Sequence, residues 1–276
     1  MNIALLLGDP VKHSLSPVMQ NAAFRACGLD WQYELRETPR ERLKDTIAHL
    51  RSNGFASANV TIPHKEAVVE FLDDITDHAC RIGAVNTIIK RDGRLIGDNT
   101  DVYGFTQSLH DAAVELRGIR AVILGAGGAA RAATFALAEQ GAERITIINR
   151  TEPRAQKLAH DLWNHFPKLN VEVGAISSIT TAHLIVNATS VGMSPNENAS
   201  PMRWSFPRGA TAVDLVYRPL QTKFLHDAER AGVRPISGIG MLVHQGAAAF
   251  KLWTGQDAPI DLMLDQAMRA LRNCEA

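Results

Sequence analysis

Residues 122–130 of the 276-residue chain read Val122-Ile123-Leu124-Gly125-Ala126-Gly127-Gly128-Ala129-Ala130. The apolar start predicts a buried strand, and the following G-x-G-x-x-A pattern is typical of a turn that leads into a dinucleotide-binding helix. Gly125 permits the tight turn, Gly127 lets the backbone approach a pyrophosphate, and Ala130 allows close helix packing, while unpaired N–H groups at the helix start face the phosphate charge. The candidate cofactor contacts are Gly125, Ala126, Gly127, Gly128 and Ala129.

A helix of small residues that merely packs tightly on a sheet would contain a similar pattern. The neighbouring segments favour dinucleotide binding, because a strand at 121–124, a helix at 129–139 and a second strand at 145–148 form a β-α-β unit.

The end of the second strand indicates which dinucleotide binds. An NAD site usually carries Asp or Glu about 20 residues after the glycines, where it accepts from the ribose 2′-hydroxyl. Here the strand ends in Asn149-Arg150-Thr151, with Arg154 close behind. Guanidinium and hydroxyl donors suit a 2′-phosphate, which a carboxylate would repel. We therefore predict NADP(H), with the alternative that Arg150 is only a solvated residue at a strand end.

Composition limits the remaining function classes. The chain is 46% hydrophobic and 21% charged, as in a globular protein, and its 29 basic and 29 acidic residues give no electrostatic basis for binding nucleic acid or a membrane surface. A small-molecule partner is expected. Cys27, Cys80 and Cys274 are odd in number and far apart, which indicates reduced thiols in the cytoplasm and no metal site. The N-terminal apolar run, interrupted by Asp9, predicts a buried strand instead of a signal peptide, and no segment suits a membrane span.

Short apolar runs alternate with helical patterns along the chain, which predicts helices packed on mixed or parallel sheets. We expect strands at 3–7, 32–35, 57–62, 121–124, 145–148, 171–173, 184–186 and 212–216. We expect helices at 17–27, 40–51, 102–116, 129–139, 154–165, 223–231, 241–253 and 261–272. A hairpin is predicted around Asp92-Gly93, a surface loop at 195–209, an N-cap at Ser16 and a capping box at 38–41.

Polar residues gather in four segments outside the nucleotide-binding unit, at 8–17, 59–65, 83–87 and 97–101. Each segment could be ordinary turn chemistry when taken singly, with Asn86 as a turn residue and Lys65 as a solvated charge. Together with the dinucleotide unit, they resemble the shikimate dehydrogenase family, whose members reduce 3-dehydroshikimate to shikimate with NADPH. The resemblance covers essentially the whole chain. It rests on H-S-x-S-P at 13–17, N-V-T-x-P-x-K at 59–65, G-A-V-N-T at 83–87, N-T-D at 99–101, G-A-G-G-A-A-R at 125–131, N-R-T at 149–151, N-A-T-S-V-G-M at 187–193 and G-x-G-M-L-V-x-Q at 238–245.

The resemblance implies an α/β fold: an N-terminal α/β substrate domain completed by C-terminal helices, plus an inserted NADP-binding Rossmann domain. The corresponding ranges are 1–101 for the substrate and catalytic domain, 102–237 for the Rossmann domain and 238–276 for the helices that return to the first domain. It also implies a role in aromatic amino-acid biosynthesis, by a monomer or homodimer.

The resemblance makes Lys65 and Asp101 the catalytic pair. Reducing a ketone builds negative charge on its oxygen, so a cationic donor stabilises that charge and can supply the proton. Asp101 would orient Lys65 and hold the hydroxyl, and which of the two donates the proton stays open. The implied substrate contacts are Ser14, Ser16, Thr61, Asn86, Tyr217 and Gln245.

Further cofactor contacts are implied at Thr189, Ser190, Met193, Leu215 and Gly238. Asp77 is also implied, although a carboxylate at a helix start, favoured by the helix dipole, explains it equally well.

Three other functions remain open. A quinate/shikimate dehydrogenase shares most of these motifs and can use NAD, and Gln20 stands where many family members carry His. An aminoshikimate-type enzyme is a further relative. A non-catalytic NADP(H) sensor would have no need for Lys65 and Asp101.

Overall fold

The computed structural model describes residues 1–276 except 53, 175, 203–204 and 276, and the side chains of 176–178 and 274–275 are also outside the description. The chain forms two compact units. The first unit contains Met1–Gly104 and Leu242–Ala276, and the second contains Phe105–Met241. Within the described part of the chain, no helix is both long and apolar enough to cross a membrane.

A six-stranded sheet in the order β2-β1-β3-β5-β6-β4 forms the centre of the first unit. Its strands are β1 (Asn2–Gly8), β2 (Trp31–Glu37), β3 (Phe55–Val60), β4 (Asp74–Ile75), β5 (Thr87–Arg91) and β6 (Arg94–Asp98). β1 runs parallel to β2 and β3, whereas β5 is antiparallel to both β3 and β6. Consequently the carboxyl ends of β1, β3 and β6 and the amino end of β5 meet at one edge.

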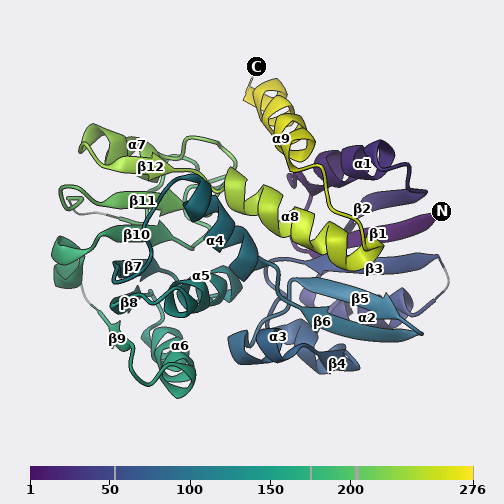
Figure 1. The fold of residues 1–276 in the computed structure, drawn as a ribbon, viewed down its shortest axis with the longest axis horizontal. Coiled ribbons are helices and arrows are strands. Elements are labelled where there is room, and N and C mark those ends of the chain that lie inside the picture. The colour runs from purple at the N-terminus through teal and green to yellow at the C-terminus, as the bar shows by residue number, and fades with distance from the viewer. Residues whose placement is uncertain (53, 175, 203–204, 276) are drawn as a thin grey trace. The chain divides into compact units, whose positions relative to one another are not determined.

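Helices α1 (Ser16–Ala26), α2 (Leu43–Leu50), α3 (Asp77–Ile82) and α9 (Ile260–Glu275) belong to this unit, with short 3-10 segments η1 (Arg40–Arg42) and η2 (Ala67–Phe71). Although far apart in sequence, α9 and α1 lie side by side (Figure 1). The unit boundary falls inside α4 (Asp101–Asp111) and α8 (Ile239–Thr254), so Leu242 and the rest of α8 belong to the first unit. A core that includes Leu5, Val60 and Ile88, each at most 2% exposed, supports the sheet.

The second unit contains a parallel sheet in the order β12-β11-β10-β7-β8-β9. Its strands are β7 (Arg120–Leu124), β8 (Arg144–Ile148), β9 (Asn170–Val173), β10 (Leu184–Asn187), β11 (Thr211–Asp214) and β12 (Arg234–Ile236). Helices α5 (Gly128–Glu139), α6 (Glu152–His165) and α7 (Lys223–Arg230) and the 3-10 segment η3 (Ile176–Thr181) connect them. The order corresponds to the Rossmann arrangement, with the strand order reversing between β7 and β10.

The predicted α/β fold class is confirmed, and most predicted elements lie within a few residues of the observed ones. Asp92 and Gly93 form a two-residue hairpin loop with φ of 51° and 76°, as the Asp-Gly signal predicts. Segment 195–209 contains no helix or strand among its described residues, while 203–204 lie outside them.

Some local predictions are wrong. Helix α1 starts at Ser16 itself, with Leu15 at the N-cap position and no side-chain cap. No capping box forms at 38–41, because η1 follows Pro39 and the Thr38 hydroxyl donates to the Arg36 carbonyl oxygen. The helix predicted at 102–116 ends at Asp111. β4 and β12 were not predicted, whereas α3 begins at Asp77, as one of the two interpretations of that residue implied. β12 is three residues long and has Pro235 at its centre, which its place at the sheet edge tolerates.

The first unit allows a stability prediction. Leu5 is 1% exposed in the central strand β1, so Leu5→Ala leaves a cavity that lowers the free energy of unfolding by about 2–5 kcal/mol. Urea denaturation followed by the fluorescence of Trp31 and Trp253, both in this unit, measures the change. The control is Leu35→Ala on β2, because Leu35 is 36% exposed and its truncation costs at most about 0.5 kcal/mol. Equal losses in the two variants would contradict this account of the core.

Candidate active site

Two loops at the carboxyl edge of the first sheet are fixed to each other by backbone hydrogen bonds. Asp9 N–H donates to the Ile62 carbonyl at 2.9 Å, and Thr61 N–H donates to the Leu7 carbonyl at 2.8 Å. Gly8 makes this approach possible, because a Cβ there would lie 2.4 Å from Thr61 Cγ2. The loop after β1, which carries Ser14, therefore lies against the loop after β3, which carries Thr61 and Lys65.

Lys65 and Asp101 form an ion pair at this edge. Lys65 Nζ lies 2.6 Å from Asp101 Oδ2, and the side chains are only 13% and 4% exposed. Asp101 is the first residue of α4, and its backbone N–H donates to Asn99 Oδ1 at 3.0 Å. The pair therefore holds a cation in a nearly dry setting, where electrostatic interactions are stronger than in water.

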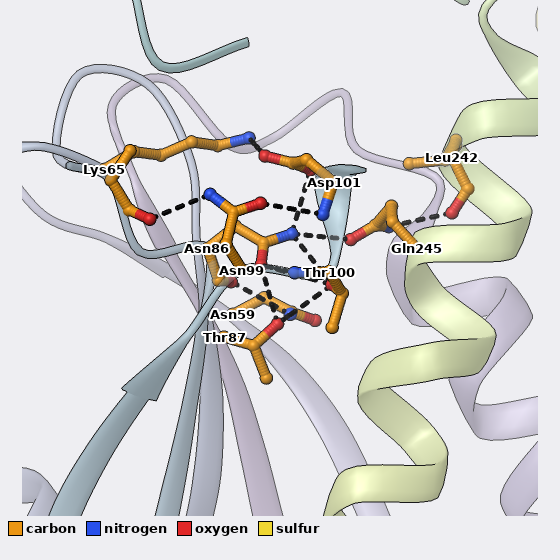
Figure 2. Close-up of polar contacts among 10 residues, drawn as sticks. Asn59, Lys65, Asn86, Thr87, Asn99, Thr100, Asp101, Leu242 and Gln245 are labelled. Atoms are coloured by element: carbon orange, nitrogen blue, oxygen red, sulfur yellow. Dashed lines mark hydrogen bonds and ion pairs between the residues drawn. The ribbon is translucent and has the colours of Figure 1, made fainter. Parts of the chain in front are cut away.

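Asn86 is the centre of the hydrogen-bond network around this pair (Figure 2). Its Nδ2 lies 2.8 Å from Asp101 Oδ1, 3.0 Å from Thr100 Oγ1 and 3.3 Å from Gln245 Oε1. Its Oδ1 accepts from Thr100 N–H at 2.7 Å. An amide nitrogen has two hydrogens for these three acceptors, so Gln245, at the longest distance, is the partner most available to a ligand.

Asn59 and Asn99 extend this network through further hydrogen bonds. Asn59 Nδ2 donates to the Asn86 carbonyl and to Thr87 Oγ1, both at 3.1 Å, and Asn99 Nδ2 donates to the Ala84 carbonyl at 2.8 Å. All are buried, and buried polar groups stabilise a unique arrangement only when they are satisfied. The polar loops of the sequence thus form one connected network.

The predicted catalytic and substrate-binding residues of the first unit differ in how closely they are joined to this network. Lys65, Asn86, Asp101 and Gln245 are directly joined. Ser14, whose Oγ accepts from Ser16 N–H at 3.2 Å, lies on the neighbouring loop at the start of α1. Thr61 is half-buried on the loop that leads to Lys65.

Tyr217 and Asp77 are carried by other elements of the chain. Tyr217 belongs to the second unit, three residues after β11. Asp77 is exposed in the first turn of α3, directly after the N-cap residue Thr76. The helix dipole stabilises its negative charge there. Cofactor binding by Asp77 stays a prediction.

The glycine turn of the second unit leaves room for a pyrophosphate. Gly125 has φ of 120°, and a Cβ there would lie 2.9 Å from the Ala188 carbonyl oxygen, so no larger residue fits. Gly127 stands at the N-cap position of α5, and a Cβ there would meet no heavy atom within 4 Å. Open space beside a helix N-terminus suits the phosphates of a dinucleotide. Ala126, Gly128 and Ala129 complete this turn.

Polar residues follow β8 where the adenosine ribose binds in Rossmann folds. Asn149 Nδ2 donates to the Thr151 carbonyl at 2.8 Å, which shapes the turn into α6. Arg150, Thr151 and Arg154 are all exposed around this turn. The residues present fit a 2′-phosphate, because they bring guanidinium and hydroxyl donors without a carboxylate at the strand end.

The ends of β10, β11 and β12 carry the remaining predicted cofactor contacts. Thr189, Ser190 and Met193 lie on the loop after β10, and Leu215 follows β11. Gly238 lies so close to β11 that a Cβ would be 2.7 Å from the Leu215 carbonyl oxygen.

Asp214 is a buried carboxyl group that the sequence analysis did not single out. It is 0% exposed at the end of β11, and burial raises its pKa to about 7, despite hydrogen bonds from Thr222, Val216 and Asn187 that favour the ionised form. Asn187, Asn59 and Thr87 were likewise not assigned roles, although each stands inside a quoted motif. Asp214 had no such signal, because an acidic residue after an apolar run is common.

The second unit contains a Rossmann sheet with this glycine turn, and the first unit is an α/β fold that holds a buried Lys–Asp pair. This is the architecture of an NAD(P)-dependent oxidoreductase. Family comparisons divide the chain consistently with that class. Residues 6–88 match the shikimate dehydrogenase substrate binding domain, residues 107–206 match shikimate / quinate 5-dehydrogenase, and residues 238–268 match the shikimate 5'-dehydrogenase C-terminal domain.

The chain belongs to the shikimate dehydrogenase family. It is 45% identical to the shikimate dehydrogenase (NADP(+)) of Methanopyrus kandleri, over 98% of this chain and 96% of that protein. The Thermus thermophilus enzyme, solved with NADP(H) and shikimate, superposes with a TM-score of 0.89 at 43% identity, over 98% of this chain and 100% of that one. Quinate dehydrogenase from Corynebacterium glutamicum, solved with NAD, gives a TM-score of 0.88 at 29% identity, over 98% and 100% of the two chains.

The raised pKa of Asp214 predicts how stability depends on pH. A carboxyl group that binds its proton more tightly when folded stabilises the protein fully below about pH 3.8, and that contribution is lost as pH rises through about 7. Asp214→Asn lacks this titration. The free energy of unfolding of the variant minus that of the wild type should therefore increase from pH 5 to pH 8.5, by at most about 3 kcal/mol.

Urea denaturation at intervals over this pH range measures the difference, in which the other titrating groups cancel. Asp227→Asn is the matched control, since Asp227 lies partly exposed on α7 beside Lys223. A difference for Asp214→Asn that stays constant with pH would contradict the raised pKa.

Proposed function

We propose that the chain catalyses the reversible, NADPH-dependent reduction of 3-dehydroshikimate to shikimate, a step of aromatic amino-acid biosynthesis. The observation that carries the proposal is the nearly dry Lys65–Asp101 pair, at 2.6 Å, inside the Asn86 network. Membership of the shikimate dehydrogenase family supports the choice of substrate, and the Thermus thermophilus relative was solved with NADP(H) and shikimate. A sensor protein would not need such a pair.

The geometry of the pair supports the following catalytic roles. NADPH, when bound, supplies the hydride to the carbonyl carbon. Lys65 donates a hydrogen bond to the carbonyl oxygen and stabilises the negative charge that develops there. Asp101 Oδ2 orients the ammonium group, while Asn86 holds Oδ1 at 2.8 Å. The proton reaches the oxygen from one of these two residues, Lys65 or Asp101, and general acid catalysis of this kind contributes about 10²–10⁴ in rate.

The other polar residues of the edge would bind the polyhydroxy acid. Ser14 and Ser16 would donate hydroxyl hydrogens to its carboxylate, and Thr61, Asn86, Tyr217 and Gln245 would contact its hydroxyl groups. Gln245 supports this role because its Oε1 has only a 3.3 Å contact with Asn86 Nδ2 in the network. We assign residues 1–101, with the helices of 238–276, to substrate binding and catalysis, and residues 102–237 to NADP(H).

The glycine turn at Gly125–Ala129 would hold the pyrophosphate, and Asn149, Arg150, Thr151 and Arg154 would hold the adenosine 2′-phosphate. Thr189, Ser190, Met193, Leu215 and Gly238 would surround the nicotinamide half, with Asp77 as a further contact. The free thiols of Cys27 and Cys80 support a cytoplasmic location, and we expect a monomer or homodimer that acts without nucleic acid.

The first test measures oxidation of NADPH with 3-dehydroshikimate. We expect Lys65→Ala to lower kcat by about 10²–10⁴ because the charge on the carbonyl oxygen loses its donor, while shikimate binding measured by calorimetry stays largely intact. Lys44→Ala, at an exposed position on α2, is the control and should match the wild type. An unchanged kcat in Lys65→Ala would refute its catalytic role. Activity mainly with NADH and 3-dehydroquinate would instead identify a quinate dehydrogenase.

The second test concerns the choice of dinucleotide. Arg150→Ala should raise the KM for NADPH by about 10–100-fold, because a charged hydrogen bond to the 2′-phosphate is worth roughly 1.5–3 kcal/mol. The KM for NADH should stay within about twofold. Arg230→Ala, an exposed arginine at the end of α7, is the control. Parallel changes for both dinucleotides would show that Arg150 does not read the 2′-phosphate.

A further inference from the structure

One buried carboxylate in the second unit joins the ends of two neighbouring strands to the start of a helix. Asp214 Oδ1 accepts from Asn187 Nδ2 at 2.8 Å and from Val216 N–H at 3.0 Å, and Asp214 Oδ2 accepts from Thr222 Oγ1 at 2.5 Å. Asn187 is the last residue of β10, Asp214 the last of β11, and Thr222 the N-cap of α7. The carboxylate therefore fixes two neighbouring strand ends to each other.

Asn187 transmits this fixation to the loop after β10. Its Oδ1 accepts from Thr189 N–H at 3.0 Å and from Thr189 Oγ1 at 2.7 Å, and its Nδ2 also donates to the Val191 carbonyl at 3.0 Å. Thr189 Oγ1 in turn accepts from Val191 N–H at 3.1 Å. The loop conformation over 188–191 is thus held by one buried amide, which Asp214 holds in orientation.

This loop lies directly against the dinucleotide turn. A Cβ at Gly125 would lie 2.9 Å from the Ala188 carbonyl oxygen and 3.2 Å from Thr189 Cγ2. β10 is also the strand across the switch point from β7, where a Rossmann fold holds the second half of its dinucleotide. A small shift of the loop would therefore move the groups that face the nicotinamide while the adenosine side keeps its place.

Burying the Asp214 carboxyl group costs folding free energy, which indicates that the group serves the function of the protein and not its stability. Its hydrogen-bond partners are an amide, a backbone N–H and a hydroxyl, and burial raises its pKa to about 7. A buried carboxyl group with neutral partners destabilises the fold when it ionises. Groups of this kind concentrate at functional sites, where the geometry they enforce is needed.

We propose that Asp214 and Asn187 form a positioning pair that orients the 188–191 loop for the nicotinamide half of NADP(H). The inference rests on the proposed function, since it concerns the same dinucleotide site. Neither residue needs to touch the substrate: Asp214 acts through Asn187, and Asn187 acts through Thr189. The residue that follows Val216 is Tyr217, so the same carboxylate also fixes the backbone beside a proposed substrate contact.

Binding of two ligands to the purified full chain separates positioning from general stability. NADP⁺ contains the nicotinamide, whereas adenosine 2′,5′-bisphosphate contains only the adenosine half. We expect Asp214→Ala and Asn187→Ala each to weaken NADP⁺ binding by about tenfold, as expected for a lost buried hydrogen bond, and to leave the bisphosphate within twofold. The change in NADPH fluorescence on binding, which reports the nicotinamide surroundings, should shrink in both variants.

Three further variants sharpen the test. Thr222→Val removes the hydroxyl that donates to Asp214 Oδ2 and that caps α7. It should therefore lower Tm while NADP⁺ binding stays within twofold. Asp214→Asn keeps the Oδ1 acceptor and should restore NADP⁺ binding to within about threefold of the wild type. The double variant Asp214→Ala/Asn187→Ala should bind NADP⁺ no more weakly than either single variant, because the two residues act in series.

Three results would overturn the proposal: equal weakening of NADP⁺ and the bisphosphate, equal effects of Asp214→Ala and Thr222→Val on NADP⁺, or additive losses in the double variant. Failure of the proposed function has a different signature. Wild-type protein that binds NADP⁺ but does not reduce 3-dehydroshikimate would overturn the proposed reaction, while the selective loss of NADP⁺ binding in the variants would still support the positioning pair.

Discussion

The arrangement of the first unit depends on burying the Lys65–Asp101 ion pair, whose side chains are 13% and 4% exposed. Asp101 is 3% exposed, and a carboxylate in that position is tolerated only if both oxygens have strong partners. Lys65 satisfies one oxygen and Asn86 the other. Asn86 must then itself be held, which explains why Thr100 and Gln245 gather around a side chain that is 2% exposed. The polar network is therefore needed to satisfy the buried oxygens of Asp101 at this edge.

The sheet topology supplies the place where that condition is met. β5 runs antiparallel to β3, so Asn86 before β5 lies beside Asn59 near the end of β3, and Thr87 pairs with Asp98 at the end of β6. Strand polarity thus brings loops from separate parts of the chain to one edge. The second unit uses the same principle in an all-parallel sheet, where the turns after β7, β8, β10 and β11 meet at one edge.

The two buried carboxyl groups, Asp101 and Asp214, are stabilised by different kinds of partner. Asp101 is paired with the ammonium group of Lys65, which suits its proposed role of orienting that cation toward the substrate. Asp214 is held by neutral donors, and burial raises its pKa to about 7, which suits a group that fixes geometry more than it supplies charge. Sequence motifs indicated Asp101 because it stands in N-T-D beside a predicted turn. Asp214 ends an ordinary apolar strand, and its importance depends on Asn187 and Thr222, which are 27 and 8 residues away.

The sequence by itself determined the features that local chemistry controls. The Gly125 turn, the Asp92-Gly93 hairpin and the α/β alternation depend on backbone freedom and on hydrophobic spacing within a few residues, so they could be predicted. The family motifs also indicated Lys65, Asn86 and Asp101 as candidates. Ser16 was wrongly expected to cap α1, because a cap depends on how the preceding loop enters the helix. β12 was missed, because a three-residue edge strand depends on pairing with its neighbour β11. Only the tertiary structure decided which polar groups meet: Asn86 and Gln245 are 159 residues apart. Their contact follows from strand order and from the placement of α8, because burial satisfies polar groups with whatever partners the packed chain brings within reach.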